Sequence, residues 1–224
     1  MNTEGNIMAK FSTILLDLDG TITDPKSGIT KSVAYALDFL KVSYPSLDSL
    51  TTFIGPPLKD SFMGYGLNEK DAQIAIEKYR EYYVKENGIF DLTIYAGFKE
   101  MLENLKKADK KICLATCKVR SYAHDILEHF SLVQYFDFIS GSELDGSRST
   151  KSEVIAFALE QTNTKVDNSV IMVGDRKHDI IGARDNNLQV ASVLYGYGTR
   201  EEFAEYKTDF VIDTVKDLEK FLLS

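Results

Sequence analysis

The chain has 224 residues, 44% of them hydrophobic, which is enough to bury the core of one large domain or of two small ones. Its formal net charge is −8 at pH 7 and no basic block offsets it, which argues against a nucleic acid polymer or a membrane surface as partner. The two cysteines are too few for a disulfide framework or a zinc site. We therefore expect a cytoplasmic protein, with a monomer as the default.

The first informative segment follows a short N-terminal stretch. Residues 1–10 lack the apolar centre of a signal peptide, and we expect a flexible leader there. The apolar run at residues 11–16 predicts a central strand of an α/β sheet, and it ends in Asp17 and Asp19. Side chains alternate along a strand, so both carboxylates can face the same way. Two anions that close repel each other unless a cation such as Mg²⁺ joins them. The segment predicts a metal-assisted site.

Two other interpretations of this segment were weighed. An EF-hand calcium loop starting at Asp17 would need Gly at position 6 and Glu at position 12, but Ile22 and Gly28 occupy those positions. That interpretation is therefore excluded. A plain Asp-Gly turn stays open on this segment alone.

The interval from about Gly28 to Asn87 is helical in pattern and contains no convincing strand. Its apolar faces are formed by Val33, Leu37 and Leu40, and by Ala72, Ile76, Tyr79 and Tyr83. A helical insertion directly after the first strand predicts a small cap over the carboxyl end of that strand, which is where open α/β sheets bind ligands. We place this helical cap domain at residues 25–91, and the α/β core domain at residues 11–24 and 92–224.

The rest of the chain alternates strands with helices. Further strands are predicted at residues 112–115, 136–139, 170–173, 190–193 and 210–212. Helical stripes lie between them, for example Phe98, Met101, Leu102 and Leu105. This alternation predicts a doubly wound, mainly parallel sheet.

Polar residues follow three of these strands. Thr116 offers a hydroxyl donor at the end of the second strand, and the adjacent Cys117 is better explained as a small passive residue than as a nucleophile. Lys151 precedes a predicted helix, where its charge would face a phosphate, a carboxylate or solvent. Asp175 and Asp179 follow another apolar strand and would stack on one helical face. One could bind a metal while the other orients it, or Asp175 could simply cap a helix.

These four segments, in this order, resemble the motifs of the haloacid dehalogenase-like hydrolase superfamily. The matching segments are DLDGT at 17–21, Thr116 in LATCK, Lys151, and GDRKHD at 174–179. The helical insertion resembles a C1-type cap, and the resemblance covers nearly the whole chain from Phe11 onward. The runs IGPPL at 54–58, GDRKHDIIGA at 174–183 and LYGYGT at 194–199 are similar to the phosphoglycolate phosphatase-like branch, which also includes 5′-nucleotidases and pyrophosphatases.

The resemblance implies a Rossmann-like fold for the core domain. It also implies a role for each acidic residue. Asp17 would attack phosphorus and form an aspartyl-phosphate, and Asp19 would act as general acid and then as general base. Mg²⁺ would bind the Asp17 carboxylate, the Asp19 backbone carbonyl and Asp175, with Asp179 close by.

The resemblance also implies substrate-binding residues. Thr116 and the backbone around Cys117 would hold phosphate oxygens, while Lys151 would neutralise charge on the nucleophile and the phosphate. Lys118 would assist phosphate or substrate binding. The cap residues Gly55 and Lys59 would face the substrate.

The implied function is a Mg²⁺-dependent phosphatase that acts on a small phosphorylated metabolite: phosphoglycolate, a nucleoside monophosphate or a sugar phosphate. Three alternatives stay open, namely a phosphomutase of the β-phosphoglucomutase type, a pyrophosphatase, and a phosphonoacetaldehyde hydrolase. The last needs a cap lysine that forms a Schiff base, and Lys31, Lys41 and Lys59 are available. Dehalogenases lack the acid that Asp19 provides, so dehalogenation is disfavoured. A non-catalytic binding domain is disfavoured because the four motifs are all present.

Overall fold

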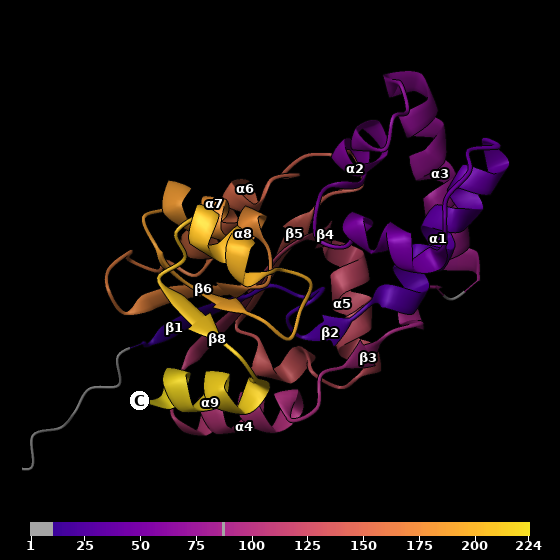
Figure 1. The fold of residues 1–224 in the computed structure, drawn as a ribbon. Helices are drawn as coiled ribbons and strands as arrows, with labels where there is room; N and C mark the ends of the chain where they lie inside the picture. Colours follow the sequence, from indigo (N-terminus) through magenta and orange to yellow (C-terminus); the bar gives the residue numbers. More distant parts are fainter. Residues whose placement is uncertain (1–10, 87) are drawn as a thin grey trace, which may run out of the picture.

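The structure is a computed structural model that describes residues 11–86 and 88–224, so the leader expected at residues 1–10 lies outside the described residues. A parallel sheet forms the centre of the molecule, with the strand order β5-β4-β1-β6-β7-β8 (Figure 1). Its strands are β1 (Thr13–Leu16), β4 (Lys111–Val119), β5 (Phe138–Ser142), β6 (Val170–Gly174), β7 (Gln189–Val193) and β8 (Phe210–Ile212). The predicted doubly wound, mainly parallel α/β fold is confirmed.

The strand β1 is central because both of its faces are apolar. Ile14 and Leu16 belong to one hydrophobic cluster, and Leu15 points to the other side of the sheet into a second cluster. All three side chains are fully buried. A strand covered on both faces reads as a continuous apolar run, which is why its position could be predicted.

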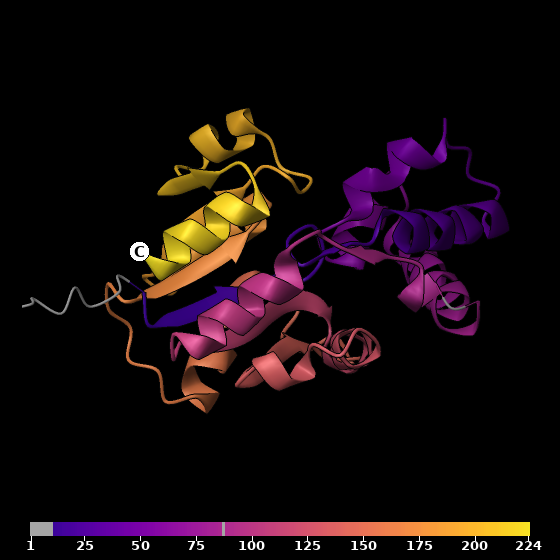
Figure 2. The same cartoon turned by 90° about the horizontal axis from the view of Figure 1, so that it is seen from below.

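Helices cover both faces of the sheet. The helices α4 (Phe98–Lys107), α5 (Arg120–His129) and α9 (Val215–Leu223) pack on one face, where α4 and α9 lie side by side (Figures 1 and 2). The helices α6 (Lys151–Gln161), α7 (Lys177–Asp185) and α8 (Arg200–Glu205) pack on the other. A capping box between Thr150 and Glu153 begins α6 at Lys151, so the local sequence fixes where this lysine stands.

The interval after β1 forms a separate group of helices, which we call the cap helices. They are α1 (Lys26–Phe39), the 3-10 helix η1 (Leu47–Phe53), α2 (Leu58–Gly64), α3 (Glu69–Lys85) and the 3-10 helix η2 (Gly88–Phe90). The helix α1 packs along α3, and in Figure 1 the group stands beside the sheet. The domain boundaries at 24/25 and 91/92 stay a proposal.

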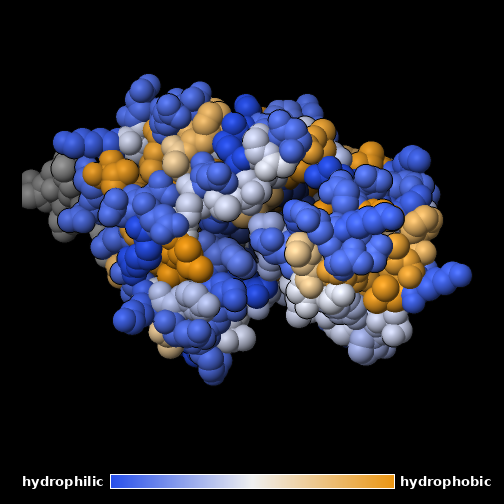
Figure 3. Space-filling model, turned by 90° about the horizontal axis from the view of Figure 1, so that it is seen from above, coloured by the Kyte–Doolittle hydropathy of each residue, from blue (hydrophilic) through white to orange (hydrophobic). Residues whose placement is uncertain are grey.

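Two short linkers join the cap helices to the core. They pair as an antiparallel ribbon, β2 (Thr23–Asp24) with β3 (Thr93–Ile94). Because the chain leaves and re-enters the core through this ribbon, its geometry sets how the cap helices stand over the sheet. The surface in Figure 3 is mainly hydrophilic, with hydrophobic residues in separate small groups. Among the described residues, no helix combines the length and apolarity that a membrane span needs.

Two predicted strand boundaries differ from the structure. The third strand, predicted at residues 136–139, runs over Phe138–Ser142, because a 3-10 turn at Val133–Tyr135 (η3) extends the preceding connection. The second, predicted to end at residue 115, continues to Val119 with an irregular register. Thr116 and Cys117 therefore lie on the end of β4 and not beyond it.

Candidate active site

The carboxyl ends of β1, β4 and β5 face a cavity of about 420 Å³, which residues of the cap helices also line. Pockets that enclose a drug-sized ligand typically measure about 300–1,000 Å³. Of the predicted site residues, the cavity is lined by Asp17, Asp19, Gly55, Lys59, Thr116, Cys117 and Lys118. Parallel strands present their carboxyl ends at one edge of a sheet, and this is what brings these motifs together.

A buried lysine joins two of the acids. The Lys151 ammonium lies 2.7 Å from Asp17 Oδ1 and 2.9 Å from Asp179 Oδ1, and it donates a hydrogen bond to the Ala115 carbonyl at 3.0 Å. Burial opposes the positive charge of Lys151, but Asp17 and Asp179 outweigh burial and raise its pKa. Burial raises the pKa of Asp17, although Lys151 acts in the opposite direction. Lys151 thus stays charged and holds Asp17 in place.

Among the four acidic residues of the site, Asp175 has the fewest hydrogen-bond and ion-pair partners for its carboxylate oxygens. Its Oδ2 accepts a hydrogen bond from the Tyr197 backbone N–H at 2.8 Å, whereas its Oδ1 is buried and has no hydrogen-bond partner among the described residues. Burial, followed by the charges of Asp179 and Asp17, raises the pKa of Asp175 well above its usual range. A buried carboxylate oxygen without a donor is costly unless a cation meets it.

The donor set fits a divalent cation. Carboxylate oxygens of Asp17, Asp175 and Asp179 lie within 4.8 Å of one another. With Asp19, four buried carboxyl groups face the two ammonium groups of Lys118 and Lys151, which leaves an excess of two negative charges when all are ionised. All of these ligand atoms are oxygens, the type that Mg²⁺ prefers.

Asp179 differs from Asp175 in how its oxygens are used. Its Oδ2 accepts hydrogen bonds from the backbone N–H groups of Asp175 and Arg176 at 3.1 and 3.0 Å, and its Oδ1 faces Lys151. Both oxygens are therefore engaged by the protein. This arrangement orients the loop that carries Asp175.

Asp19, the residue predicted to transfer protons, forms an ion pair with Lys118. Lys118 Nζ lies 2.8 Å from Asp19 Oδ2 and donates a hydrogen bond to the Tyr83 hydroxyl at 2.8 Å. Burial raises the pKa of Asp19, and Lys118 acts against it. Burial opposes the charge of Lys118, but the groups around it, Asp19 foremost, together outweigh burial and raise the Lys118 pKa. Tyr83 belongs to α3, so the contact joins the core to the cap helices.

The remaining predicted residues occupy different parts of the cavity wall. Thr116 Oγ1 accepts a hydrogen bond from the Lys118 backbone N–H at 3.2 Å. Burial raises the pKa of Cys117 to about 12, so this thiol is a poor nucleophile. Lys59 forms an exposed ion pair with Glu69 at 2.6 Å.

Several cavity residues were not found by the sequence analysis. Ile29, Phe53, Arg80 and Tyr122 line the cavity together with Ile76, Tyr79 and Tyr83, which were predicted only as apolar faces. The Arg176 guanidinium, next to Asp175, donates a hydrogen bond to the Ile54 carbonyl at 2.9 Å, and so ties the core to the cap segment. The helical periodicity of α3 is the only sequence signal that pointed to any of these residues.

The fold and the site together define an α/β enzyme. Its acidic centre lies at the carboxyl edge of a parallel sheet, next to the cap helices. Residues 14–193 match the sequence model of the haloacid dehalogenase-like hydrolases. The chain belongs to this family, as the resemblance of its four motifs predicted.

Relatives within the family are similar over most of the chain. A 5′-nucleotidase from Pseudomonas aeruginosa is 39% identical over 199 residues, which cover 88% of this chain and 89% of the relative. The tyrosine-protein kinase PtkA from Mycobacterium tuberculosis is 35% identical, over 89% of this chain and 67% of the kinase. A crystal structure of a predicted phosphatase from Clostridium acetobutylicum superposes with a TM-score of 0.91 at 43% identity and covers 95% of this chain and 98% of the other. The protein is a phosphoric monoester hydrolase of the haloacid dehalogenase type.

Proposed function

We propose that the protein is a Mg²⁺-dependent phosphatase that hydrolyses a small phosphomonoester through an aspartyl-phosphate on Asp17. The observation that carries this proposal is the buried Asp175 Oδ1, which has no partner among the described residues and lies in a cluster with excess negative charge. The Asp17 and Asp175 side chains and the Asp19 backbone carbonyl would hold the ion, with Asp179 orienting them. The bound ion would neutralise phosphate charge and help to align the ester.

The contacts of Asp17 suit it to attack phosphorus. Its Oδ1 accepts the Leu18 backbone N–H at 2.8 Å and faces Lys151, so this oxygen is held by two donors. The other oxygen, Oδ2, makes no hydrogen bond to the described residues and is left to form the bond to phosphorus. Lys151 and the Thr116 hydroxyl would offset the charge that builds up on the phosphate oxygens.

Asp19 lies two residues from the nucleophile and would handle the protons. In the first step the Asp17 oxygen bonds to phosphorus, the ester P–O bond breaks, and the leaving oxygen takes a proton from Asp19. In the second step Asp19 accepts a proton from water, whose oxygen bonds to phosphorus and releases the Asp17 carboxylate. Lys118 stabilises the carboxylate form of Asp19, which this second step requires.

The cavity lining makes a nucleoside 5′-monophosphate the leading substrate candidate. The cavity lining includes the apolar and aromatic side chains of Phe53, Ile76, Tyr79 and Tyr122. Such a lining suits a leaving group with a planar base better than a two-carbon acid. The similarity to a 5′-nucleotidase supports the same choice. Phosphoglycolate and sugar phosphates remain in the panel to be tested.

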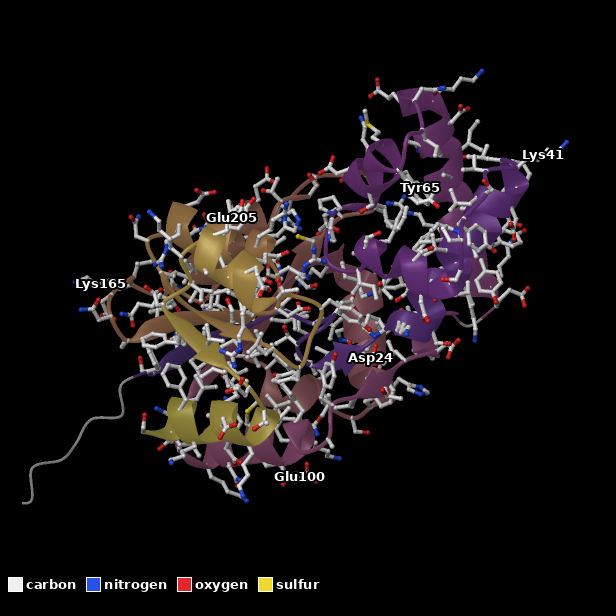
Figure 4. The ribbon with its side chains drawn as sticks, in the orientation of Figure 1. Asp24, Lys41, Tyr65, Glu100, Lys165 and Glu205 are labelled. Carbon is white, nitrogen blue, oxygen red and sulfur yellow. The ribbon has the colours of Figure 1, made fainter. Side chains whose placement is uncertain are left out.

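Phosphonate cleavage gains no support from the cap lysines. Lys31 pairs with Asp91 at 2.7 Å and Lys59 pairs with Glu69. Lys41 points away from the cavity at the far end of the cap helices (Figure 4). A Schiff-base lysine needs a desolvated position next to the reacting carbonyl, and none of these residues has one.

The decisive experiment measures phosphate release by the purified chain from nucleoside monophosphates, sugar phosphates, phosphoglycolate and pyrophosphate, with Mg²⁺ and with a chelator. We expect Mg²⁺-dependent release that is lost in Asp17→Asn and kept in Asp125→Asn, an exposed carboxylate on α5 that serves as the matched control. Absence of Mg²⁺-dependent release from every ester would contradict the proposal, as would near-wild-type activity of Asp17→Asn.

A further inference from the structure

The loop at residues 194–199 has no part in the proposed chemistry, yet it packs directly against the acidic centre. A Cβ atom added at Gly196 would lie 2.3 Å from the Gly20 carbonyl oxygen and 2.5 Å from Asp175 Cβ. Both contacts are too close for any side chain, so glycine is required there. The loop is thus seated between the first acidic segment and Asp175.

Tyr197 in this loop makes two contacts that face in different directions. Its backbone N–H donates to Asp175 Oδ2 at 2.8 Å, on the side of the acidic centre. Its hydroxyl donates to Asp24 Oδ1, on β2. Figure 4 labels Asp24 at the junction of the core and the cap helices. One residue therefore holds a carboxylate of the acidic centre and the first linker to the cap helices.

Tyr195 holds the second linker. Its ring packs edge-on against Tyr95 with the ring centroids 4.9 Å apart. Tyr95 directly follows β3, and its backbone N–H donates to the Ile22 carbonyl at 3.1 Å. Two tyrosines of one loop, two residues apart, thus contact both linkers while the loop backbone contacts Asp175.

We propose that Tyr197 is a positioning residue that couples the Asp175 carboxylate to the seating of the cap helices. A ligand that fixes Asp175 fixes the Tyr197 backbone, and through the hydroxyl it also fixes Asp24 and the linker ribbon. Coupling between two sites is reciprocal, so seating of the cap helices strengthens binding at Asp175 to the same extent. This inference rests on the proposed Mg²⁺ site.

The test measures hydrogen exchange of the Tyr95 backbone amide, a reporter in the linkers, with and without Mg²⁺. In the wild type we expect Mg²⁺ to slow this exchange by about fivefold or more, the lower end of typical coupling. In Tyr197→Phe this Mg²⁺-dependent slowing should be lost. Asp24→Ala removes the same hydrogen bond from its other end and should give the same result, with no added effect in the double variant. Tyr135→Phe is the matched control, since it removes a tyrosine–carboxylate bond to Glu103 at 2.9 Å, and it should keep the slowing.

Calorimetric titration of the wild type with Mg²⁺ separates the two proposals. If the wild type binds Mg²⁺ but its Tyr95 amide does not respond, or if the response persists in Tyr197→Phe and Asp24→Ala, the coupling is wrong and the proposed function stands. If the wild type binds no Mg²⁺, both proposals fail. A merely structural role for Tyr197 would change exchange equally with and without the ion, and that result would also overturn the coupling.

Discussion

Lys118 Nζ lies 2.8 Å from Asp19 Oδ2, so the carboxylate proposed to transfer protons is held by a buried cation. The same ammonium donates to Tyr83 on α3 at 2.8 Å. Lys118 therefore has one partner in the core and one in the cap helices. Lys118 thus links the proposed proton-transfer residue to the cap helices.

The first prediction concerns Lys118→Met, which removes the charge and keeps much of the side-chain volume. We expect kcat/KM to fall by about 10²–10³-fold, the usual loss when a preorganised charged donor is removed from an enclosed site. Steady-state phosphate release measures the change. Lys118→Arg keeps the charge and should recover part of the loss. A Lys118→Met variant within twofold of the wild type would contradict this account of the Asp19 contact.

The second prediction compares Asp175→Asn with Asp179→Asn. Asp175 Oδ1 is buried and has neither a hydrogen bond nor an ion pair among the described residues, whereas Asp179 Oδ2 accepts two backbone hydrogen bonds and Asp179 Oδ1 forms an ion pair with Lys151. We expect Asp179→Asn to weaken Mg²⁺ binding by about 10–100-fold, as for residues that orient a ligand. Asp175→Asn should weaken it more.

Thermal unfolding with and without Mg²⁺ provides an independent measurement for the second prediction. Ligands that bind the native state raise its stability, so Mg²⁺ should raise the Tm of the wild type and leave that of Asp175→Asn unchanged. Without Mg²⁺, Asp175→Asn should be the more stable protein because it removes a buried, unpaired charge. An equal Mg²⁺ response in the wild type and Asp175→Asn would contradict the role proposed for Asp175.

The third prediction concerns a carboxylate far from the site. Asp137 accepts a hydrogen bond from the Ile112 backbone N–H at 2.8 Å and pairs with Lys106 at 2.9 Å. Partial burial acts to raise the pKa of Asp137, but the Ile112 and Lys106 contacts outweigh it and hold the pKa below the ordinary value of 3.8. The folded state therefore binds this proton less readily than the unfolded state does.

The sign of the pH effect at Asp137 follows from linkage. The stabilising contribution is fully present above the unfolded pKa and is lost as pH falls through the lower folded pKa. Asp137→Asn should lower the free energy of unfolding by about 1 kcal/mol at pH 7, the value of one net hydrogen bond. The difference should shrink below about pH 4. Urea unfolding at several pH values measures this difference in the free energy of unfolding, with the exposed Asp125→Asn as control. A difference between the wild type and Asp137→Asn that does not change with pH would refute the proposed pKa shift of Asp137.

The sequence predicted the sheet and the acidic edge because both depend on local patterns. A buried parallel strand is a continuous apolar run, and the polar residues that follow such runs meet at one edge of the sheet. The contacts of the core with the cap helices and with their linkers could not be predicted in this way. Lys118 meets Tyr83 across 35 residues, Arg176 meets Ile54 across 122, and Tyr197 meets Asp24 across 173. Such pairings depend on how the cap helices pack against the core. The spacing of hydrophobic residues along the sequence does not predict that packing.

The fourth prediction concerns Arg80, which lines the cap side of the cavity. Its Nη1 donates to the Leu144 carbonyl at 3.4 Å, and the guanidinium has no carboxylate partner among the described residues. It lies on α3, the helix that also carries Tyr79 and Tyr83. A charged donor in this position is available to the part of the substrate that is remote from phosphorus.

We expect Arg80→Met to raise KM for a nucleoside monophosphate by about tenfold, equivalent to about 1.4 kcal/mol of binding, with little change in kcat. Acetyl phosphate, which fills only the space next to Asp17, should be hydrolysed with an unchanged KM. Lys85→Met is the matched control, since Lys85 lies on the same helix with an exposed side chain. Equal changes in KM for both substrates would mean that Arg80 acts on the position of the cap helices and would contradict this prediction. A KM effect confined to the nucleotide would support a leaving group bound against α3.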